Sequence, residues 1–190
     1  MKVSVITVTY NSGKTIEDTM KSVASQTYPN IEHIIIDGVS TDNTLEIVQR
    51  FPHVAKVVSE KDSGIYNAMN KGLALATGDI IGTLNSDDFF SANEVISKIV
   101  SAFPAGAMIT FGDVAFVQPG NLSRIIRYYS SKYWKPSKFK WGFMPPHPSC
   151  YIRNECFAQA GNYKEDYKIS SDYELLTRFL YRYNFPFAYI

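Results

Sequence analysis

The feature that most constrains the fold is the regular alternation of short apolar runs with longer stretches of helical periodicity. The apolar runs, rich in β-branched residues, are expected strands and cover residues 3–8, 31–36, 54–58, 80–84 and 108–111. Between them, apolar residues recur every three or four positions, as in Ile16, Met20 and Val23. Strands that alternate with helices favour an open, mostly parallel sheet with right-handed crossovers. The sequence therefore predicts an α/β domain.

Composition places the chain among globular domains. Of its 190 residues, 45% are hydrophobic and 19% are charged, a balance that excludes both a disordered chain and a fibrous one. The net charge of +1 and the absence of a nucleic-acid-binding motif argue against a nucleic-acid partner. One domain over residues 1–190 is therefore expected.

Two features bear on the cellular compartment. Cys150 and Cys156 are too few for a disulfide framework and lack the spacing of a zinc or redox site, so we expect reduced thiols that serve as packing residues. The sequence opens on a strand pattern and not on a secretory leader, and no apolar run approaches the roughly 18 residues of a membrane-spanning helix. The expected location is cytoplasmic.

Polar side chains gather directly after the expected strands. The first strand is followed by Thr9-Tyr10-Asn11, the second ends at Asp37-Gly38, and the fourth is followed by Asn85-Ser86-Asp87-Asp88. Ligands of open α/β sheets bind at the carboxyl ends of the strands, so these segments are predicted to converge. The chain lacks the glycine-rich signatures of a dinucleotide site and of a P-loop, which excludes those two kinds of nucleotide site.

Asp87 and Asp88 are the most informative of these residues. Two adjacent carboxylates repel each other unless a cation or solvent relieves the repulsion. Mg²⁺ commonly takes one or two carboxylates and completes its coordination with water and substrate phosphates. Taken alone, such a pair more often caps a helix or lies in a solvated turn, and a metal-assisted diphosphate site is the alternative that the neighbouring motifs favour.

Six motifs occur in the order and spacing of one known family. They are Val8-Thr9-Tyr10-Asn11, Ile36-Asp37-Gly38-Val39-Ser40-Thr41-Asp42, Asp62-Ser63-Gly64-Ile65-Tyr66-Asn67-Ala68-Met69-Asn70-Lys71-Gly72, Ala76-Thr77-Gly78-Asp79, Leu84-Asn85-Ser86-Asp87-Asp88 and Ser171-Asp172-Tyr173-Glu174-Leu175. Through these motifs the chain resembles the family 2 glycosyltransferases of bacterial polysaccharide biosynthesis over essentially its whole length. The resemblance implies the GT-A fold, a nucleotide-binding α/β/α sandwich with a mostly parallel central sheet, and sugar transfer with inversion.

The resemblance also implies where the nucleotide binds. The matching positions are Thr9, Tyr10, Asn11, Asp37, Asp62 and Asp87. A carboxylate at a strand end, such as that of Asp37, accepts a hydrogen bond from a uracil N–H or a ribose hydroxyl. The alternative role of Asp37 is to bind the free N–H groups of the turn that follows it.

Asp87 and Asp88 match the acidic motif with which the family binds Mn²⁺ or Mg²⁺ at the diphosphate. That motif is commonly Asp-x-Asp, and this sequence departs from it because Asn85 stands at the leading position. An amide accepts a hydrogen bond but brings no charge, which puts the strength of the metal contact in question. Asn85 is also a candidate for contact with the diphosphate or the acceptor.

Asp172 matches the catalytic base of the family. Ser171 and Glu174 have the spacing of a capping box, which predicts that Asp172 lies in the first turn of a helix. In the implied single displacement, Asp172 takes the proton of an acceptor hydroxyl while the metal stabilises charge on the departing diphosphate. The alternative is a structural role, because an Asp in a first helical turn interacts favourably with the helix dipole.

Two further side chains are candidates for contacts. His147 lies among prolines, at a position where related sequences often carry a His near the diphosphate or the acceptor. A lone His is more often structural, which is the alternative. Arg178 suits either a phosphate or a solvated helix face.

A basic stretch follows the last expected strand. Between Asp113 and Glu155 the chain carries seven Lys or Arg and no acid, and aromatic residues interleave with these bases. Residues 124–143 are therefore candidates for stacking on sugar rings or for peripheral contact with the inner face of an anionic membrane. Aromatics inside and lysines outside is the plain alternative.

The predicted function is transfer of a sugar from a nucleoside diphosphate sugar, with a UDP-sugar favoured, to a saccharide or lipid-linked saccharide. We expect residues 1–112 to bind the donor and residues 113–190 to face the acceptor, a half that is a candidate for truncation because family members usually continue further. Two alternatives stay open: a binding module without turnover, which Asn85 favours, and a nucleotidyltransferase, which lacks its usual glycine-rich basic loop here.

Overall fold

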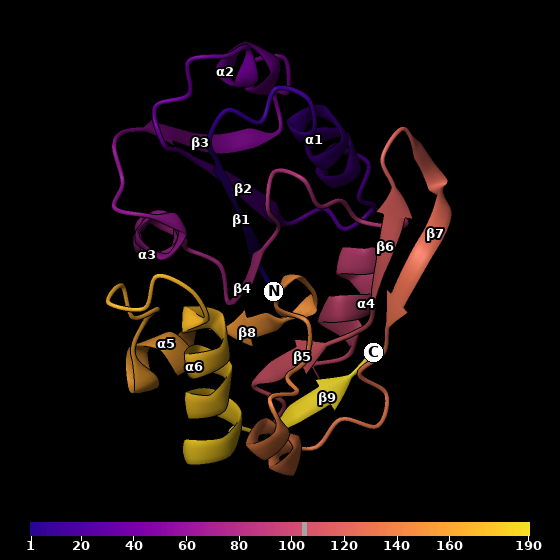
Figure 1. Ribbon diagram of the computed structural model, residues 1–190, viewed down its shortest axis with the longest axis vertical. Coiled ribbons are helices and arrows are strands. Elements are labelled where there is room, and N and C mark those ends of the chain that lie inside the picture. The colour runs from indigo at the N-terminus through magenta and orange to yellow at the C-terminus, as the bar shows by residue number, and fades with distance from the viewer. Residues whose placement is uncertain (104–105) are drawn as a thin grey trace.

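The computed structural model describes residues 1–103 and 106–190 (Figure 1). Its strands are β1 (Val3–Thr9), β2 (Ile31–Asp37), β3 (Val54–Ser59), β4 (Ile80–Thr83), β5 (Ile109–Phe111), β6 (Val114–Gln118), β7 (Asn121–Tyr129), β8 (Tyr151–Arg153) and β9 (Phe187–Tyr189). Its helices are α1 (Ile16–Ala24), α2 (Thr44–Val48), α3 (Ile65–Leu75), α4 (Val95–Ser101), α5 (Asn154–Ala160) and α6 (Ser171–Thr177), with 3₁₀ turns η1 (Pro136–Trp141) and η2 (His147–Ser149) and a π-helical turn η3 (Arg178–Arg182).

The main sheet is organised around β1. In the described residues its strand order is β3-β2-β1-β4-β8-β5-β9. β1 pairs in parallel with β2 over its whole length and with β4 from Val3 to Ile6, whereas β8 runs antiparallel between β4 and β5. Every residue of β1 is buried, as expected for a β-branched strand covered on both faces. The predicted α/β fold with a mostly parallel sheet is confirmed.

Helices cover both faces of this sheet (Figure 1). On one face α3, α5 and α6 pack against Ile6, Ile34 and Phe111. On the other face α1 and α4 pack against Val5 and Ile80, and α1 with α2 packs against Ile35. Cys150 and Cys156 are free thiols in the first of these cores, so their predicted packing role is confirmed. The result is the expected α/β/α sandwich.

A two-stranded hairpin of β6 and β7 stands beside the main sheet (Figure 1). The sequence showed a basic, aromatic stretch over residues 124–143 but did not predict the hairpin. Asp113 fixes its base by accepting hydrogen bonds from Tyr128 Oη at 2.6 Å, Ser131 N at 2.7 Å and Tyr189 Oη at 2.9 Å. All residues of β7 except its last are exposed, so this strand contributes little to the core.

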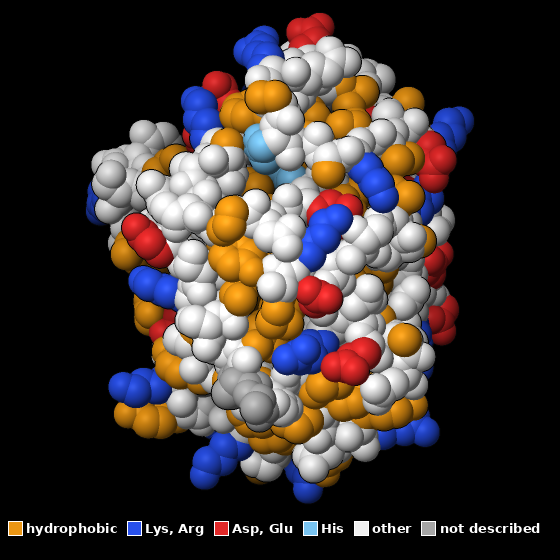
Figure 2. Space-filling model, turned by 180° about the vertical axis from the view of Figure 1, so that it is seen from behind, with side chains coloured by type: hydrophobic (Ala, Val, Ile, Leu, Met, Phe, Trp, Pro, Cys, Tyr) orange, Lys and Arg blue, Asp and Glu red, His pale blue; other side chains and the backbone are white. Residues whose placement is uncertain are grey.

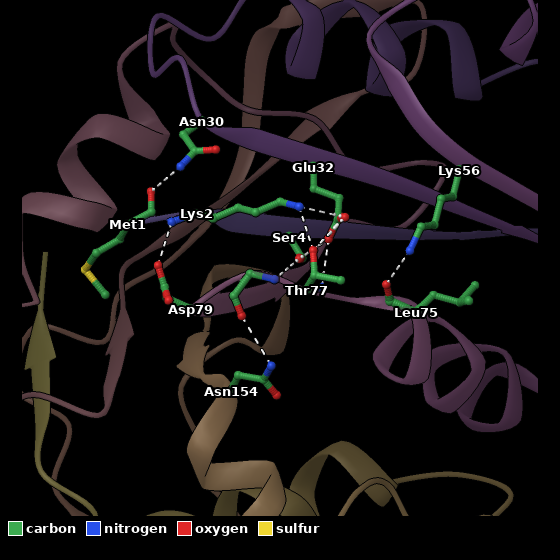
Figure 3. A network of polar contacts seen from close by, with 11 residues as sticks. Met1, Lys2, Ser4, Asn30, Glu32, Lys56, Leu75, Thr77, Asp79 and Asn154 are labelled. Atoms are coloured by element: carbon green, nitrogen blue, oxygen red, sulfur yellow. Dashed lines mark hydrogen bonds and ion pairs between the residues drawn. The ribbon is translucent and has the colours of Figure 1, made fainter.

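A polar network ties the amino ends of the strands together (Figure 3). The buried carboxylate of Glu32 accepts hydrogen bonds from Lys2 Nζ at 2.9 Å, Ser4 Oγ at 2.7 Å and Thr77 N at 2.9 Å. Burial opposes ionisation, but the bonds from Thr77, Lys2 and Ser4 outweigh it and lower the pKa of Glu32 to about 2. The network links β1, β2 and the turn before β4 at the edge opposite the strand-end motifs.

The predicted capping box of α6 is wrong. The helix does begin at Ser171, but Ser170 is its N-cap, with a left-handed φ of 72° and no side-chain cap bond. Glu174 turns instead to Arg178 Nη2, 2.8 Å away, and to Lys164 Nζ at 3.0 Å. Two cations attract the carboxylate more strongly than one backbone N–H does.

One other local expectation also needs correction. Arg178 is buried and donates to the carbonyl oxygens of residues 160–162 as well as to Glu174, so it lies neither on a solvated face nor free for a phosphate. No helix within the described ranges is long and apolar enough to cross a bilayer.

His33 on β2 makes stability depend on pH. Its buried ring lies 3.0 Å from Thr7 Oγ1 and 3.1 Å from His53 Nε2. Burial, with a smaller effect of His53, lowers the pKa of His33 to about 3. The pKa of an unfolded His is about 6.5. Below that pH the unfolded chain therefore takes up a proton that the native state does not bind, and native stability falls.

We expect the free energy of unfolding of the wild type to fall by up to about 2 kcal/mol more than that of a His33→Gln variant between pH 7 and pH 5. Urea unfolding of both proteins at the two pH values measures the difference. Titrating groups common to both proteins cancel in this comparison. Equal losses in the two proteins would contradict the assignment of a neutral, buried His33.

Candidate functional site

The loops that follow β1, β2 and β4 meet at the carboxyl edge of the sheet. Asn11 N donates to Ser40 Oγ at 2.8 Å, and Asn11 Oδ1 accepts from Thr41 N at 2.8 Å. The hydroxyl oxygens of Ser12 and Ser86 lie 2.8 Å apart. These contacts join the loop after β1 to the loops after β2 and β4. The strand-end segments therefore converge, as the parallel sheet requires.

Tyr10 and Asp62 flank Gly38 at this edge. Tyr10 is 64% exposed, and Asp62 is also exposed. A methyl group on Gly38 would come within 2.8 Å of Asp62 Oδ2 and 3.4 Å of the Tyr10 ring. Asp62 Oδ1 accepts from Gly64 N at 2.9 Å, which fixes the carboxylate at the start of α3. The glycine therefore keeps an aromatic face and a carboxylate close together and open to solvent.

Asp37 and Thr9 are buried behind this surface. The carboxylate of Asp37 accepts from Ser40 N at 3.0 Å, Ser40 Oγ at 2.5 Å and Ser59 Oγ at 2.6 Å. The bond from Ser40 N is the kind of contact expected for the alternative role of Asp37, in which the carboxylate binds the turn that follows it. Thr9 Oγ1 is buried and has no hydrogen-bond partner within the described ranges.

Val39, between Gly38 and Ser40, adopts a left-handed φ of 65°. A β-branched residue rarely adopts this conformation, because its branched side chain clashes with the backbone there. Strain of this kind persists where surrounding structure imposes it, and it concentrates at functional sites. The loop after β2 is therefore held in a costly conformation next to Tyr10 and Asp62.

The acidic pair occupies a fixed turn after β4. Thr19 Oγ1 of α1 donates to the carbonyl oxygen of Asp88 at 2.7 Å, and Asp88 N donates to the carbonyl of Asn85 at 3.0 Å. Asp87 is exposed, whereas Asp88 is half-buried. Burial, followed by the charge of Asp87, raises the pKa of Asp88 to about 6. The pair does not cap the next helix, since the N-cap of α4 is Glu94.

The residues of this turn fit a divalent cation that shares its coordination with a substrate. No group of three or more His, Cys, Asp or Glu side chains in the described part of the chain forms a complete protein site. Two adjacent carboxylates do offer anionic oxygens, and Asn85 Oδ1 is buried without a hydrogen-bond partner among the described residues. Mg²⁺ and Mn²⁺ favour oxygen donors and commonly retain substrate oxygens.

Asp172 lies in the first turn of α6, as predicted, and is half-buried. Tyr66 Oη donates to Asp172 Oδ1 at 3.0 Å. Tyr66 belongs to the first turn of α3, four residues after Asp62. One short segment therefore lies against both the Tyr10 surface, through Asp62, and Asp172, through Tyr66. Tyr66 stood within a motif of the sequence but had no assigned role, because its contact spans 106 residues.

His147 is buried on η2. Its Nε2 lies 2.7 Å from Tyr163 Oη. Burial lowers the pKa of His147, although the charge of Asp172 opposes that effect. These contacts fit the structural role, which is the alternative prediction for His147. Tyr163, like Tyr66, had no role in the sequence prediction.

The basic, aromatic stretch is neither wholly buried nor wholly exposed. Trp134 and Phe139 are buried, whereas Tyr133, Trp141 and Phe143 are exposed, at 76%, 80% and 56%. Tyr129, Ser130, Trp134, Lys138, Trp141 and Phe143 line a shallow cavity of about 380 Å³. On the back of the molecule, hydrophobic side chains show at the surface near the upper end and over the lower half, with Lys and Arg among them and at the margin (Figure 2). The plain arrangement with every aromatic inside is therefore wrong.

Comparison with known proteins connects this edge to a family. Residues 4–157 match the model of glycosyl transferase family 2. An uncharacterized glycosyltransferase of Mycobacterium tuberculosis is 33% identical over 182 residues, which cover 93% of this chain and 68% of that protein. A Bacillus subtilis protein named for teichuronic acid biosynthesis is 43% identical over 101 residues, or 51% of this chain and 40% of its own length.

Solved structures share the whole fold. S. aureus TarS 1–349 in complex with UDP superimposes with a TM-score of 0.81 at 21% identity. The mannosyltransferase PcManGT of Pyrobaculum calidifontis, in complex with GDP-Man and Mn²⁺, gives a TM-score of 0.77 at 23% identity. Both cover 100% of this chain, which spans only 58% and 54% of theirs. The chain belongs to glycosyltransferase family 2, a family of sugar-transferring enzymes, and has the GT-A fold.

Proposed function

We propose that this protein transfers a sugar from a nucleoside diphosphate sugar, preferably a UDP-sugar, to an acceptor hydroxyl with inversion. The observation that carries the proposal is the meeting of three regions at one edge: Tyr10 with Asp62, the Asp87-Asp88 pair, and Asp172 through Tyr66. Synthesis of a bacterial cell-surface polysaccharide is the process we infer, and the name of the Bacillus subtilis relative supports it. The acceptor we infer is a saccharide, free or lipid-linked.

The nucleoside would bind beside Gly38. The exposed ring of Tyr10 offers a face on which a base stacks, and Asp62 offers a carboxylate oxygen to a base N–H or a ribose hydroxyl. Asp87 is exposed on the neighbouring loop and suits the ribose or the diphosphate. Thr9 would contribute its backbone to this surface. Asn11 holds the neighbouring loop through the hydrogen bond from Thr41 N, and Asp37 holds the same loop through the hydrogen bond from Ser40 N.

Asp87 and Asp88, with Asn85 beside them, are the residues that would hold Mn²⁺ or Mg²⁺. When bound, such an ion neutralises charge that develops on a departing diphosphate. Asn85 contributes no charge, so we infer that the substrate's own phosphate oxygens supply much of the coordination. The complex of PcManGT with GDP-Man and Mn²⁺ supports a divalent ion in this fold.

Asp172 would act as the general base. The acceptor hydroxyl has a pKa far above 7, so its proton must be removed as the oxygen attacks the anomeric carbon. The proton passes to the Asp172 carboxylate, the new C–O bond forms, and the bond from the anomeric carbon to the diphosphate breaks with its electron pair on the diphosphate. Attack opposite the leaving group inverts the anomeric centre and needs no covalent enzyme intermediate.

Replacement of the base separates binding from chemistry. We expect Asp172→Asn to leave UDP-sugar binding nearly unchanged, because this side chain lies outside the nucleotide surface, and to reduce the transfer rate to below about a tenth of that of the wild type. Isothermal titration calorimetry and a UDP-release assay measure the two quantities. A variant that retains more than a tenth of the rate would sink the base assignment.

Replacement of the half-buried Asp88 tests the metal contact. We expect Mn²⁺ to raise the thermal midpoint of the wild type in the presence of UDP, because ligand binding stabilises the native state. In Asp88→Asn the increment from Mn²⁺ should largely disappear, whereas in the exposed control Asp18→Asn it should persist. An undiminished increment in Asp88→Asn would exclude this carboxylate as a ligand.

A binding module without turnover is the second candidate, and Asn85 is the observation in its favour. The two candidates differ in one respect, since both bind a nucleotide sugar but only the enzyme consumes it. Slow Mn²⁺-dependent hydrolysis of a UDP-sugar, lost in Asp172→Asn, would support the enzyme. Binding without hydrolysis or transfer would support the module.

Peripheral contact with a membrane is a further part of the proposal. The exposed Lys135, Lys138 and Lys140 lie beside the exposed Trp141 and Phe143, an arrangement that suits an anionic lipid surface. We expect the change of these three lysines to Gln to weaken sedimentation with phosphatidylglycerol vesicles by several-fold. The same change at Lys14, Lys61 and Lys98 is the charge-matched control, and an equal effect of the two triple variants would count against a local membrane surface.

A further inference from the structure

We propose that Tyr66 is the positioning residue of Asp172 and that α3 clamps the base in place. This inference rests on the proposed role of Asp172 as base. Tyr66 Oη donates to Asp172 Oδ1 at 3.0 Å across 106 residues of sequence. None of the described residues donates a hydrogen bond to Oδ2, so that oxygen is left to take the proton of the acceptor hydroxyl.

The phenol of Tyr66 is built to donate. Burial, then the nearby charge of Asp172, raises the pKa of Tyr66, so the hydroxyl keeps its proton at neutral pH. Its ring is stacked on that of Tyr163, with centroids 5.9 Å apart and planes inclined by 23°. The stacking fixes the direction in which the hydroxyl points.

Tyr163 is held in turn by a buried partner. Its Oη lies 2.7 Å from His147 Nε2. Burial raises the pKa of Tyr163 and lowers that of His147, so the hydrogen bond joins two neutral side chains. His147 is thus separated from Asp172 by Tyr163 and Tyr66, and it supports the base through these two side chains. This role requires no contact between His147 and a substrate.

The rest of α3 anchors the clamp. Asn70 Nδ2 donates to Tyr163 O at 2.9 Å, and Tyr163 N returns a bond to Asn70 Oδ1 at 3.1 Å. Asn67 and Asn70 both donate to Glu165. Gly72 allows the helix to lie against β1, since a methyl group there would come within 2.4 Å of Ile6. The motif from Asp62 to Gly72 therefore joins the proposed donor surface to the base.

The neighbours of Asp172 supply no full positive charge to hold it. The titratable groups that lie near Asp172 are Tyr66 on α3, His147 on η2, Cys150 before β8 and Tyr163 before α6. All four are neutral at pH 7, so none attracts the carboxylate as a full positive charge does. The hydrogen bond from Tyr66 is therefore the contact that orients the carboxylate.

The test is a Tyr66→Phe variant, which keeps the stacked ring and removes only the hydroxyl. UDP release from a UDP-sugar with Mn²⁺ is measured at pH 7 on the whole chain. We expect kcat to fall about tenfold and KM for the UDP-sugar to change less than about twofold, because only the orientation of the base is lost. Tyr28→Phe, which removes a hydroxyl bonded to Met1 O far from the site, is the matched control and should keep the wild-type kcat and KM.

Asp172→Asn, assayed in parallel, separates the two possible failures. If Asp172→Asn is inactive while Tyr66→Phe keeps the wild-type kcat, the positioning role is wrong and the base assignment stands. If Asp172→Asn keeps its rate, both are overturned. A fall in kcat for Tyr66→Phe with a comparable rise in KM would indicate a general structural loss and would also overturn the positioning role.

Discussion

The parallel pairing of β1 with β2 and β4 is the constraint on which the rest of the structure depends. Its register sets Thr9 opposite Asp37 and Ile6 opposite Thr83, so the three strands end at the same edge of the sheet. The loops that follow are then close enough for Asn11 to bond to Ser40 and for Ser12 to reach Ser86. The acidic pair lies beside the Tyr10 surface because these backbone ladders hold both loops there.

The second organising element is α3, which connects the two ends of the proposed reaction. Its amino end presents Asp62 toward Gly38, its first turn presents Tyr66 to Asp172, and Gly72 seats it on the sheet. A single helix therefore sets where the proposed donor surface and the proposed base lie relative to each other. Catalytic geometry depends on such placement, because small displacements of a reacting group cost large factors in rate.

The sequence predicted the features that depend on local pattern. Strand periodicity located β1 to β5 within about a residue or two, and strand-end placement indicated Tyr10 and Asp88. It could not predict contacts between distant segments, such as Tyr66 with Asp172, since nothing in a linear motif specifies its partner. The predicted capping box was wrong for a related reason. Ser171 and Glu174 have the required spacing. In the folded chain, however, Arg178 and Lys164 form ion pairs with the Glu174 carboxylate. The β6–β7 hairpin escaped prediction because almost all of β7 is exposed and its apolar pattern reflects no core.

The most direct test of the central claim, that one edge of the sheet holds both the nucleotide and the metal, is a crystal structure with UDP and Mn²⁺, in which anomalous scattering locates the ion. The account predicts the uracil against Tyr10 and Asp62 and the Mn²⁺ on the carboxylates of Asp87 and Asp88. Nucleotide in the cavity beside Tyr129 and Trp141, or Mn²⁺ away from the acidic pair, would contradict it.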